Sequence, residues 1–132
     1  MGGRGASSGG RSGRAPSGYR RVGKVYGIVV LRSSDTRGKI LPTAASPNSQ
    51  YLGMNKHGKI KQLRSYDNNG RVKQDIDWGH SFDGRSERTV HSHKWKNGER
   101  DKTHRPLTKS EILKYKEVIE KATGRKDLIW EW

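Results

Sequence analysis

A short internal repeat constrains the fold of this chain more than any other feature of the sequence. The segment HGKIKQ, which begins at His57, recurs twelve residues later as NGRVKQ, and a tyrosine-containing segment precedes each copy. A period of this length, with a glycine turn in each copy, is typical of an antiparallel meander. The repeat therefore predicts successive strands over residues 50–55, 59–66 and 71–78. After a loop over residues 79–88, one more strand is expected over residues 89–96.

The residues before the repeat divide into an arm and the beginning of a domain. Residues 1–23 are mostly Gly, Ser and Arg, and a segment with so little apolar surface to bury is expected to be disordered. The run from Val25 to Leu31 is apolar apart from Gly27, which indicates one strand covered on both faces. Residues 39–45 are expected to form a brief second strand, limited by Pro42. We therefore expect a single folded domain over residues 24–132.

The C-terminal part of the chain has the pattern of one amphipathic helix. Thr108 and Glu111 have the spacing of a capping box, and apolar residues then recur at the helical period until Gly124. Trp130 and Trp132 are expected to pack back onto the domain. The predicted fold class is α+β: an antiparallel β-meander with one C-terminal helix packed on it and a disordered basic N-terminal arm. The lysines expected on the outer face of the helix are Lys109, Lys114, Lys116 and Lys121.

The charge of the chain indicates a polyanionic partner. The 132 residues include 28 Lys and Arg against 13 Asp and Glu, which gives a formal net charge of +15. Because no apolar run is long enough to span a bilayer, the expected partner is nucleic acid and not a membrane. Basic residues crowd the predicted hairpins, and we interpret them as the face that contacts phosphates. These residues are Lys56, Lys59, Lys61, Arg64, Arg71 and Lys73, with Lys94 on a neighbouring strand.

Two further observations bound the chemistry and the location. The chain contains no cysteine, which excludes disulfides, thiolate nucleophiles and thiolate metal sites. Its start, MGGRGASSGG, lacks the apolar region of a signal peptide, so export by that route is not expected. The arm is expected either to contact a phosphate backbone loosely or to act as a solvated linker.

Acidic and imidazole side chains alternate along two of the predicted strands. Asp75 and Asp77 are two residues apart, as are His91 and His93, so each pair is expected to leave one face of its strand. His80 lies between the two strands. In a metal-independent ribonuclease, one imidazole takes the 2′-OH proton, another imidazole or a lysine protonates the leaving oxygen, and a cation stabilises the phosphorane. In a metal-dependent nuclease, His and Asp ligate a divalent ion that activates water.

The spacing leaves both schemes open. The basic surroundings supply positive charge without a cofactor, which favours the metal-free scheme with His91 and His93 as acid and base. Asp75 or Asp77 would then orient an imidazole, and Arg100 with Lys94 would contact the phosphate. In the alternative, a divalent metal ion would be held by His91, His93, Asp77 and His80. A purely structural interpretation also stands, with the histidines flanking Trp95 on a half-buried sheet face.

Short motifs in this region resemble the C-terminal toxin domains of bacterial polymorphic and contact-dependent systems. The motifs are a Ser-Pro-Asn-Ser start at residues 46–49, a Tyr-Asp-x-x-Gly turn at residues 66–70, an Asp-Ile-Asp strand followed by His80, and a His-x-His-x-Trp strand that ends near Arg100. The opening MGGRGASSG also resembles the start of small proteins encoded by prophages of Gram-positive bacteria. The resemblance covers about residues 46–105.

The resemblance implies cleavage of nucleic acid, with RNA favoured over DNA, and a cognate immunity protein or a host factor as a partner. It also implies action in the cytoplasm of a bacterial host cell. The alternative is a non-catalytic phage protein that binds nucleic acid or a host factor. The positions that match the motifs are Asp75, Asp77, His80, His91, His93 and Arg100.

Overall fold

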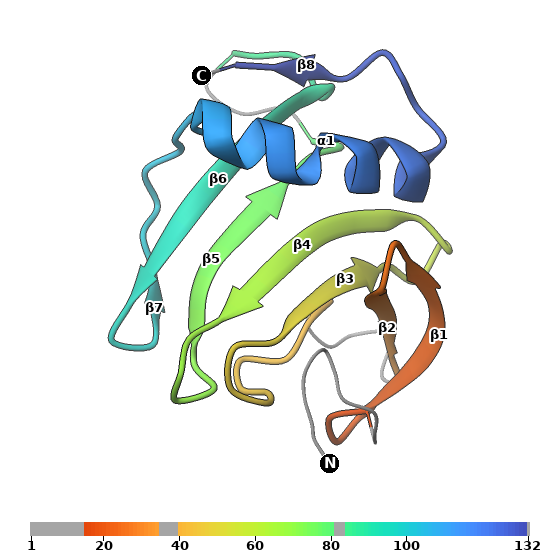
Figure 1. Ribbon diagram of the computed structural model, residues 1–132, viewed down its shortest axis with the longest axis vertical. Helices are drawn as coiled ribbons and strands as arrows, with labels where there is room; N and C mark the ends of the chain where they lie inside the picture. The colour runs from red at the N-terminus through yellow and green to blue at the C-terminus, as the bar shows by residue number, and fades with distance from the viewer. Residues whose placement is uncertain (1–14, 35–39, 81–83, 132) are drawn as a thin grey trace.

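The computed structural model describes residues 15–34, 40–80 and 84–131, which form an α+β fold. Within them, one mixed sheet contains eight strands, and the helix α1 (Lys109–Thr123) crosses one face of it (Figure 1). The predicted class, with a C-terminal helix packed on a sheet, is confirmed. The strands are β1 (Tyr19–Val25), β2 (Ile28–Ser33), β3 (Gln50–Met54), β4 (Ile60–Tyr66), β5 (Val72–Asp77), β6 (Thr89–Lys96), β7 (Glu99–Arg100) and β8 (Ile129–Trp130).

The antiparallel meander is confirmed from β3 to β7 and is wrong for the two ends of the sheet. The strands predicted from the repeat all form, and each strand from β3 to β7 pairs antiparallel with the next. However, β2 pairs in parallel with β3, and β8 pairs in parallel with β6. A parallel pair needs a crossover connection. The repeat covers only residues 57–74, so it carried no information about either crossover.

The apolar run at the start of the domain forms a hairpin, so the single strand predicted from Val25 to Leu31 is wrong. The chain reverses at Tyr26 and Gly27, whose φ angles of 48° and 83° are those of the two central residues of a type I′ turn. Gly27 adopts a positive φ without steric cost, and it is the residue that interrupts the apolar run. β1 begins at Tyr19, so residues 19–23, which the composition assigned to the disordered arm, belong to a strand. Residues 1–14 of the predicted arm lie outside the described residues.

Side chains, and not a strand ladder, hold the segment over residues 40–45. Its backbone pairing among the described residues is one isolated bridge between Ala44 and Arg71, so the brief strand predicted here is wrong; residues 35–39 lie outside the described residues. The carbonyl of Pro42 accepts hydrogen bonds from Oη of Tyr66 at 2.6 Å and from Nη1 of Arg64 at 3.2 Å. Leu41 packs with apolar residues of β2, and this packing fixes the segment against the sheet.

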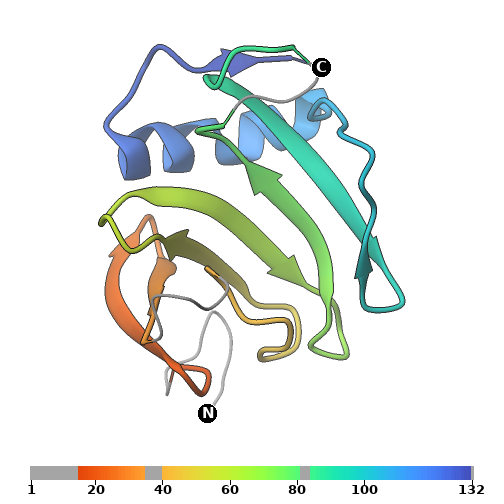
Figure 2. The same ribbon diagram turned by 180° about the vertical axis from the view of Figure 1, so that it is seen from behind.

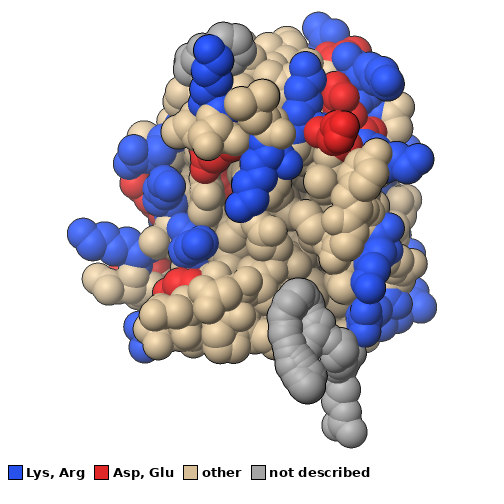
Figure 3. All heavy atoms as spheres, viewed as in Figure 1, with Lys and Arg blue, Asp and Glu red and all other residues tan. Residues whose placement is uncertain are grey.

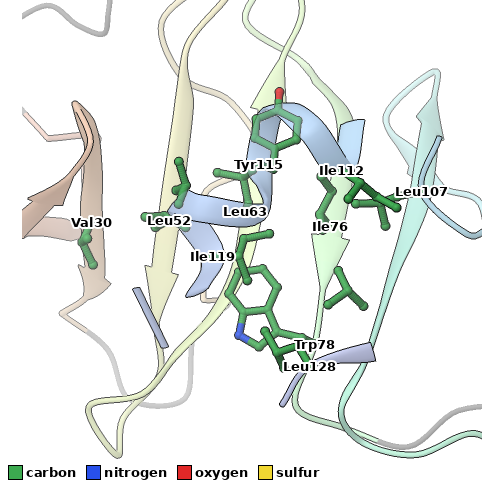
Figure 4. Packing of buried hydrophobic residues seen from close by; sticks show 12 residues of the cluster. Val30, Leu52, Leu63, Ile76, Trp78, Leu107, Ile112, Tyr115, Ile119 and Leu128 are labelled. Carbon is green, nitrogen blue, oxygen red and sulfur yellow. The ribbon is translucent and has the colours of Figure 1, made fainter. Parts of the chain in front are cut away.

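Helix α1 begins and ends where its capping signals predict. The hydroxyl of Thr108 accepts a hydrogen bond from the backbone N–H of Glu111 at 3.1 Å, and the Glu111 carboxylate accepts one from the backbone N–H of Thr108 at 2.8 Å. The helix ends at Gly124, and the four lysines expected on its outer face are exposed. Its inner face packs on the sheet (Figure 4). The helix contributes Ile112, Tyr115, Val118 and Ile119, and the sheet contributes Val30, Leu52, Leu63, Ile76 and Val90.

The other face of β4, β5 and β6 carries the polar residues of the candidate site. Figure 2 shows these strands from behind, with α1 on the far side. Trp78 belongs to the core under the helix, and its indole donates a hydrogen bond to the Ile60 carbonyl at 2.9 Å. Trp130 is half-buried against the same core, as expected, and Trp132 lies outside the described residues.

Candidate active site

The strand alternation and the register together place the predicted acidic and imidazole groups on one face. Ile76 packs under α1, so Asp75 and Asp77 on either side of it point to the opposite face. In the β5–β6 pair, Asp75 lies opposite His93 and Asp77 lies opposite His91. All four side chains are buried, with exposures of 0–4%. The predicted proximity of the two pairs is therefore confirmed.

Asp75 is the acceptor at the centre of a buried hydrogen-bond network. Its carboxylate accepts two hydrogen bonds from Arg64, from Nε at 2.6 Å and from Nη2 at 3.0 Å, and one from Nε1 of Trp95 at 2.8 Å. The Arg64 guanidinium also lies 5.0 Å from the centre of the Trp95 ring. Because Arg64 is only 5% exposed and bonded in this way, its predicted role in contacting phosphate is wrong. The residue compensates a buried charge instead.

Asp77 joins this network to the histidines. It accepts a hydrogen bond of 2.9 Å from the amide of Gln62 and a charged one from Nη2 of Arg100, and its carboxylate lies 3.8 Å from Nε2 of His93. Burial raises the pKa of Asp77 above its ordinary value, and the charge of Arg100 offsets only part of this effect. Arg100 is 38% exposed, so its guanidinium joins the buried carboxylates to the surface of the site.

Four imidazoles form one cluster beside Asp77, and one of them was not predicted. The ring centres of His91 and His93 lie 5.3 Å apart, and His80 lies 4.9 Å from His91. His104 lies 4.6 Å from His93 and 5.3 Å from His91, again between ring centres. Of the five histidines in the chain, only His57 is placed elsewhere, in the exposed turn between β3 and β4.

The hairpin that follows β6 brings His104 to the cluster. Asn97 and Gly98 have positive φ angles of 53° and 80°, and the chain returns antiparallel along β6. An isolated bridge between Ser92 and Arg105 continues this return, so His104 falls beside His93. The Asn-Gly pair is a strong hairpin signal, and extending the implied pairing along β6 would have identified His104 from the sequence.

Backbone carbonyls determine which nitrogen of the two buried imidazoles carries the lone pair. Nδ1 of His93 lies 3.0 Å from the carbonyl oxygen of Asp101, and Nδ1 of His91 lies 3.4 Å from that of Thr89. A carbonyl only accepts, so Nδ1 carries the proton in each neutral ring and Nε2 carries the lone pair. Burial lowers the pKa of His91 to about 3 and also lowers the pKa of His93. Both rings are therefore neutral at pH 7, which disfavours the predicted role of His91 as a general acid.

The remaining basic residues of the predicted phosphate-contacting face lie at two ends of the sheet. In the β4–β5 pair, Gln62 lies opposite Asp77, so the β3–β4 turn with Lys56 and Lys59 is at the end that carries the histidines. Lys61 is also at this end, and its ammonium donates to the Gly79 carbonyl at 3.4 Å. The other three, Arg71, Lys73 and Lys94, lie toward the opposite end, where Gln74 pairs with Lys94. Figure 3 shows Lys and Arg spread over the α1 face, with acidic groups beside several of them, and no single continuous stripe.

A separate hollow of about 450 Å³ lies at the N-terminal end of α1 and contains no histidine. Its polar groups bond to one another: the amide of Gln50 donates to Oη of Tyr115 at 2.5 Å, and the amide of Gln74 donates to Glu111 at 2.6 Å. The histidine cluster therefore remains the better candidate for chemistry, because it gathers several groups that transfer protons or bind metals.

The fold and the site define an α+β domain with a histidine- and aspartate-rich sheet face. Comparison of the chain with protein-family models, with curated proteins and with solved structures found no match. Among the described residues, no helix is both long enough and apolar enough to cross a membrane.

Proposed function

We propose that this protein is a small basic endonuclease that cleaves RNA at the histidine cluster. The observation that carries the proposal is the convergence of four imidazoles, the Asp77 carboxylate and the Arg100 guanidinium on one sheet face of a chain with a net charge of +15. Groups that transfer protons, next to a cation and within a basic protein, are what cleavage of a phosphodiester requires.

The burial of the residues suggests how the roles are divided. His80 is exposed at the edge of the cluster, so its imidazole is the group that a 2′-hydroxyl can approach, and it acts as the general base. Arg100 presents the exposed side of its guanidinium to the charged phosphorane. Lys61 lies on the same face of β4 as Leu63, beside the end of α1, so it does not face the cluster, and the leaving oxygen takes its proton from water. The buried His91 and His93 support this surface and do not exchange protons with the substrate themselves.

The resemblance to toxin domains extends the proposal to partners and location. A ribonuclease of this kind acts in the cytoplasm of a bacterial cell, and the cell that makes it needs an immunity protein or another inhibitor. An acidic protein surface that covers His80 and Arg100 would neutralise it, because the site is bordered by exposed cations.

The test is cleavage of total tRNA, ribosomal RNA and plasmid DNA by purified protein, with His80→Ala as the variant and His57→Ala as its matched control. Both substitutions remove an exposed imidazole, but only His80 belongs to the cluster. We expect wild type and His57→Ala to cut RNA equally, and His80→Ala to lose about 100-fold or more in rate with its RNA affinity retained. Equal rates for the two variants would contradict the assigned role.

A second candidate function, binding of nucleic acid or of a host factor without catalysis, is favoured by one specific observation. Asp75 bonds to Arg64 and Trp95 in a way that satisfies a buried charge, so part of the polar face has a structural purpose. Under this function no substrate is cut by any variant, while RNA binding depends on the exposed lysines and weakens steeply with salt.

A further inference from the structure

Three imidazoles, those of His91, His93 and His104, have a spacing that suits metal binding, and this property does not depend on RNA cleavage. One ring nitrogen from each of His91, His93 and His104 lies within 4.8 Å of the other two. His91 and His93 are on the same face of β6. His104 comes from the segment after β7, which runs along the edge of β6. Three imidazoles from two backbone segments that are bridged to each other have little freedom to separate.

The hydrogen bonds of the cluster are those of histidine ligands. In metal sites the coordinating imidazole usually donates its other ring N–H to a carbonyl or a carboxylate, which fixes the ring and its tautomer. His93 donates from Nδ1 to the Asp101 carbonyl and His91 from Nδ1 to the Thr89 carbonyl, so Nε2 of each carries the lone pair that a cation would bind. Asp101 and His104 belong to the same returning segment, so the segment that supplies the third ligand also orients His93.

We infer that His91, His93 and His104 form a binding site for one first-row transition metal ion, with Zn²⁺ as the best-fitting example. Imidazole nitrogen suits Zn²⁺, Cu²⁺, Ni²⁺ and Fe²⁺, whereas Mg²⁺ and Ca²⁺ prefer sets of oxygen ligands. Zn–N bonds of about 2.0–2.1 Å in a tetrahedral site place the ligand nitrogens about 3.4 Å apart, so binding draws the three rings together by about 1.4 Å at most.

A second group of possible ligands adjoins this one. Asp77, His80 and His91 form a second group whose ligand atoms are equally close, but Asp77 is already bonded to Gln62 and Arg100. Three protein ligands with a fourth position open to water or substrate is the arrangement of catalytic zinc sites. If the proposed function holds, an ion at this position would polarise the phosphate next to His80.

The experiment uses the full chain without an affinity tag, because a histidine tag would bind the same ions. The protein is stripped with EDTA and dialysed, then titrated with ZnCl₂ by calorimetry and with CoCl₂ by visible absorption, and the bound metal is counted by elemental analysis. The variants are His104→Ala and His91→Ala, with His57→Ala as the matched control. His104 is half-buried, so its variant keeps the test valid if the buried His91→Ala fails to fold.

We expect wild type and His57→Ala to bind one Zn²⁺ per chain, to give Co²⁺ ligand-field bands, and to show a raised thermal unfolding temperature with metal. His104→Ala should bind at least about 100-fold more weakly, since loss of a direct ligand exceeds the 10–100-fold typical of losing its hydrogen-bond partner. Absence of stoichiometric binding by the wild type, or equal affinity in His104→Ala, would overturn the site.

The metal site and the proposed nuclease function can be contradicted independently of each other. A protein that binds Zn²⁺ through His104 and cuts no RNA keeps the metal site and overturns the proposed nuclease function. Cleavage that persists in EDTA, in a protein that binds no Zn²⁺, overturns the metal site and leaves the nuclease function standing.

Discussion

At the scale of single residues, the charge of Asp75 is compensated by two guanidinium groups, one from β4 and one from β7. Arg64 on β4 bonds to both carboxylate oxygens, and Nε of Arg100 on β7 lies 3.6 Å away. Removing one member of a buried pair leaves an uncompensated charge, which costs far more than the pair contributes when it is intact. Arg64 is therefore more important for folding than any exposed arginine of the same sheet.

Replacing Arg64 with Ala should lower the free energy of unfolding by about 3–5 kcal/mol, because Asp75 would remain buried without its bidentate partner. Urea unfolding monitored by tryptophan fluorescence measures this change. The matched control is Arg71→Ala, which removes an exposed guanidinium from the neighbouring hairpin and should change stability by about 0.5 kcal/mol or less. Equal losses in the two variants would show that the buried pair is not what stabilises this face.

The sequence was sufficient to predict which aspartates and histidines share a face, but not which basic residue would be buried with them. Alternation along a strand is a local property, so Asp75 with Asp77 and His91 with His93 follow from spacing alone. Whether Arg64 is buried depends on the β4–β5 register, in which it lies opposite Asp75. It also depends on the carbonyls of residues 41 and 42, which complete its hydrogen bonds. A basic residue in an isolated strand pattern shows none of these interactions.

At the scale of secondary structure elements, the start of α1 is linked to the sheet through Glu111. Its carboxylate accepts from the backbone N–H of Thr108 and from the amide of Gln74 on β5, so the helix cap and a sheet strand share one acceptor. Burial by itself would raise the pKa of Glu111, but these hydrogen bonds outweigh it and the pKa lies below its ordinary value. The ionised form is therefore the one that stabilises the folded state.

The stabilisation from Glu111 should be complete at neutral pH and lost in acid. Because its pKa is lower in the folded than in the unfolded state, the contribution is fully present above the unfolded value and disappears as the pH falls through the folded value. Glu111→Gln preserves the size of the side chain and removes the charge. We expect the variant to be less stable by about 0.3–1 kcal/mol at pH 7, and the difference to shrink toward zero near pH 3. Thermal unfolding of both proteins across this range is the measurement, and a difference that grows in acid would contradict the assignment.

The element boundaries differ in how far local signals determine them. The capping box and Gly124 fix both ends of α1 by contacts within a few residues, and the sequence predicted them correctly. The β1–β2 hairpin and the parallel β2–β3 and β6–β8 pairs depend on contacts between distant segments, which apolar content alone does not specify. His104 is an intermediate case. The Asn97-Gly98 turn can be recognised in the sequence, but it brings His104 to the cluster only when the strand pairing is extended along β6.

At the scale of the whole molecule, the positive charge attracts a polyanion without by itself selecting where it binds. The lysines of the β3–β4 turn lie at the end of the sheet that carries the histidines, whereas Arg71 and Lys73 lie at the other end. A nucleic acid bound at the second end is held but is remote from His80. Binding and cleavage should therefore respond differently to substitutions at the two ends.

The double variants Lys56→Glu/Lys59→Glu and Arg71→Glu/Lys73→Glu test this difference, since each changes the net charge by the same amount. RNA affinity should fall in both, and the slope of log Kd against log salt should decrease by about 0.7 for each phosphate of a single strand that the protein no longer neutralises. The cleavage rate at saturating RNA should fall at least about tenfold only in the first variant. Binding isotherms at several salt concentrations and single-turnover cleavage measure the two effects. Equal loss of cleavage in both variants would contradict a site at the histidine end.

The parallel pairing of β8 with β6 also has a consequence for the order in which the chain folds during synthesis. Ile129 pairs with Thr89, and Trp130 pairs with Val90, the residue before His91. β8 is synthesised well after β6, and until then the edge of β6 next to His91 is not covered by β8. The pairing that covers the edge of β6 beside His91 therefore forms only after residue 130 has been made, so a nascent chain carries all its histidines before this part of the sheet is complete.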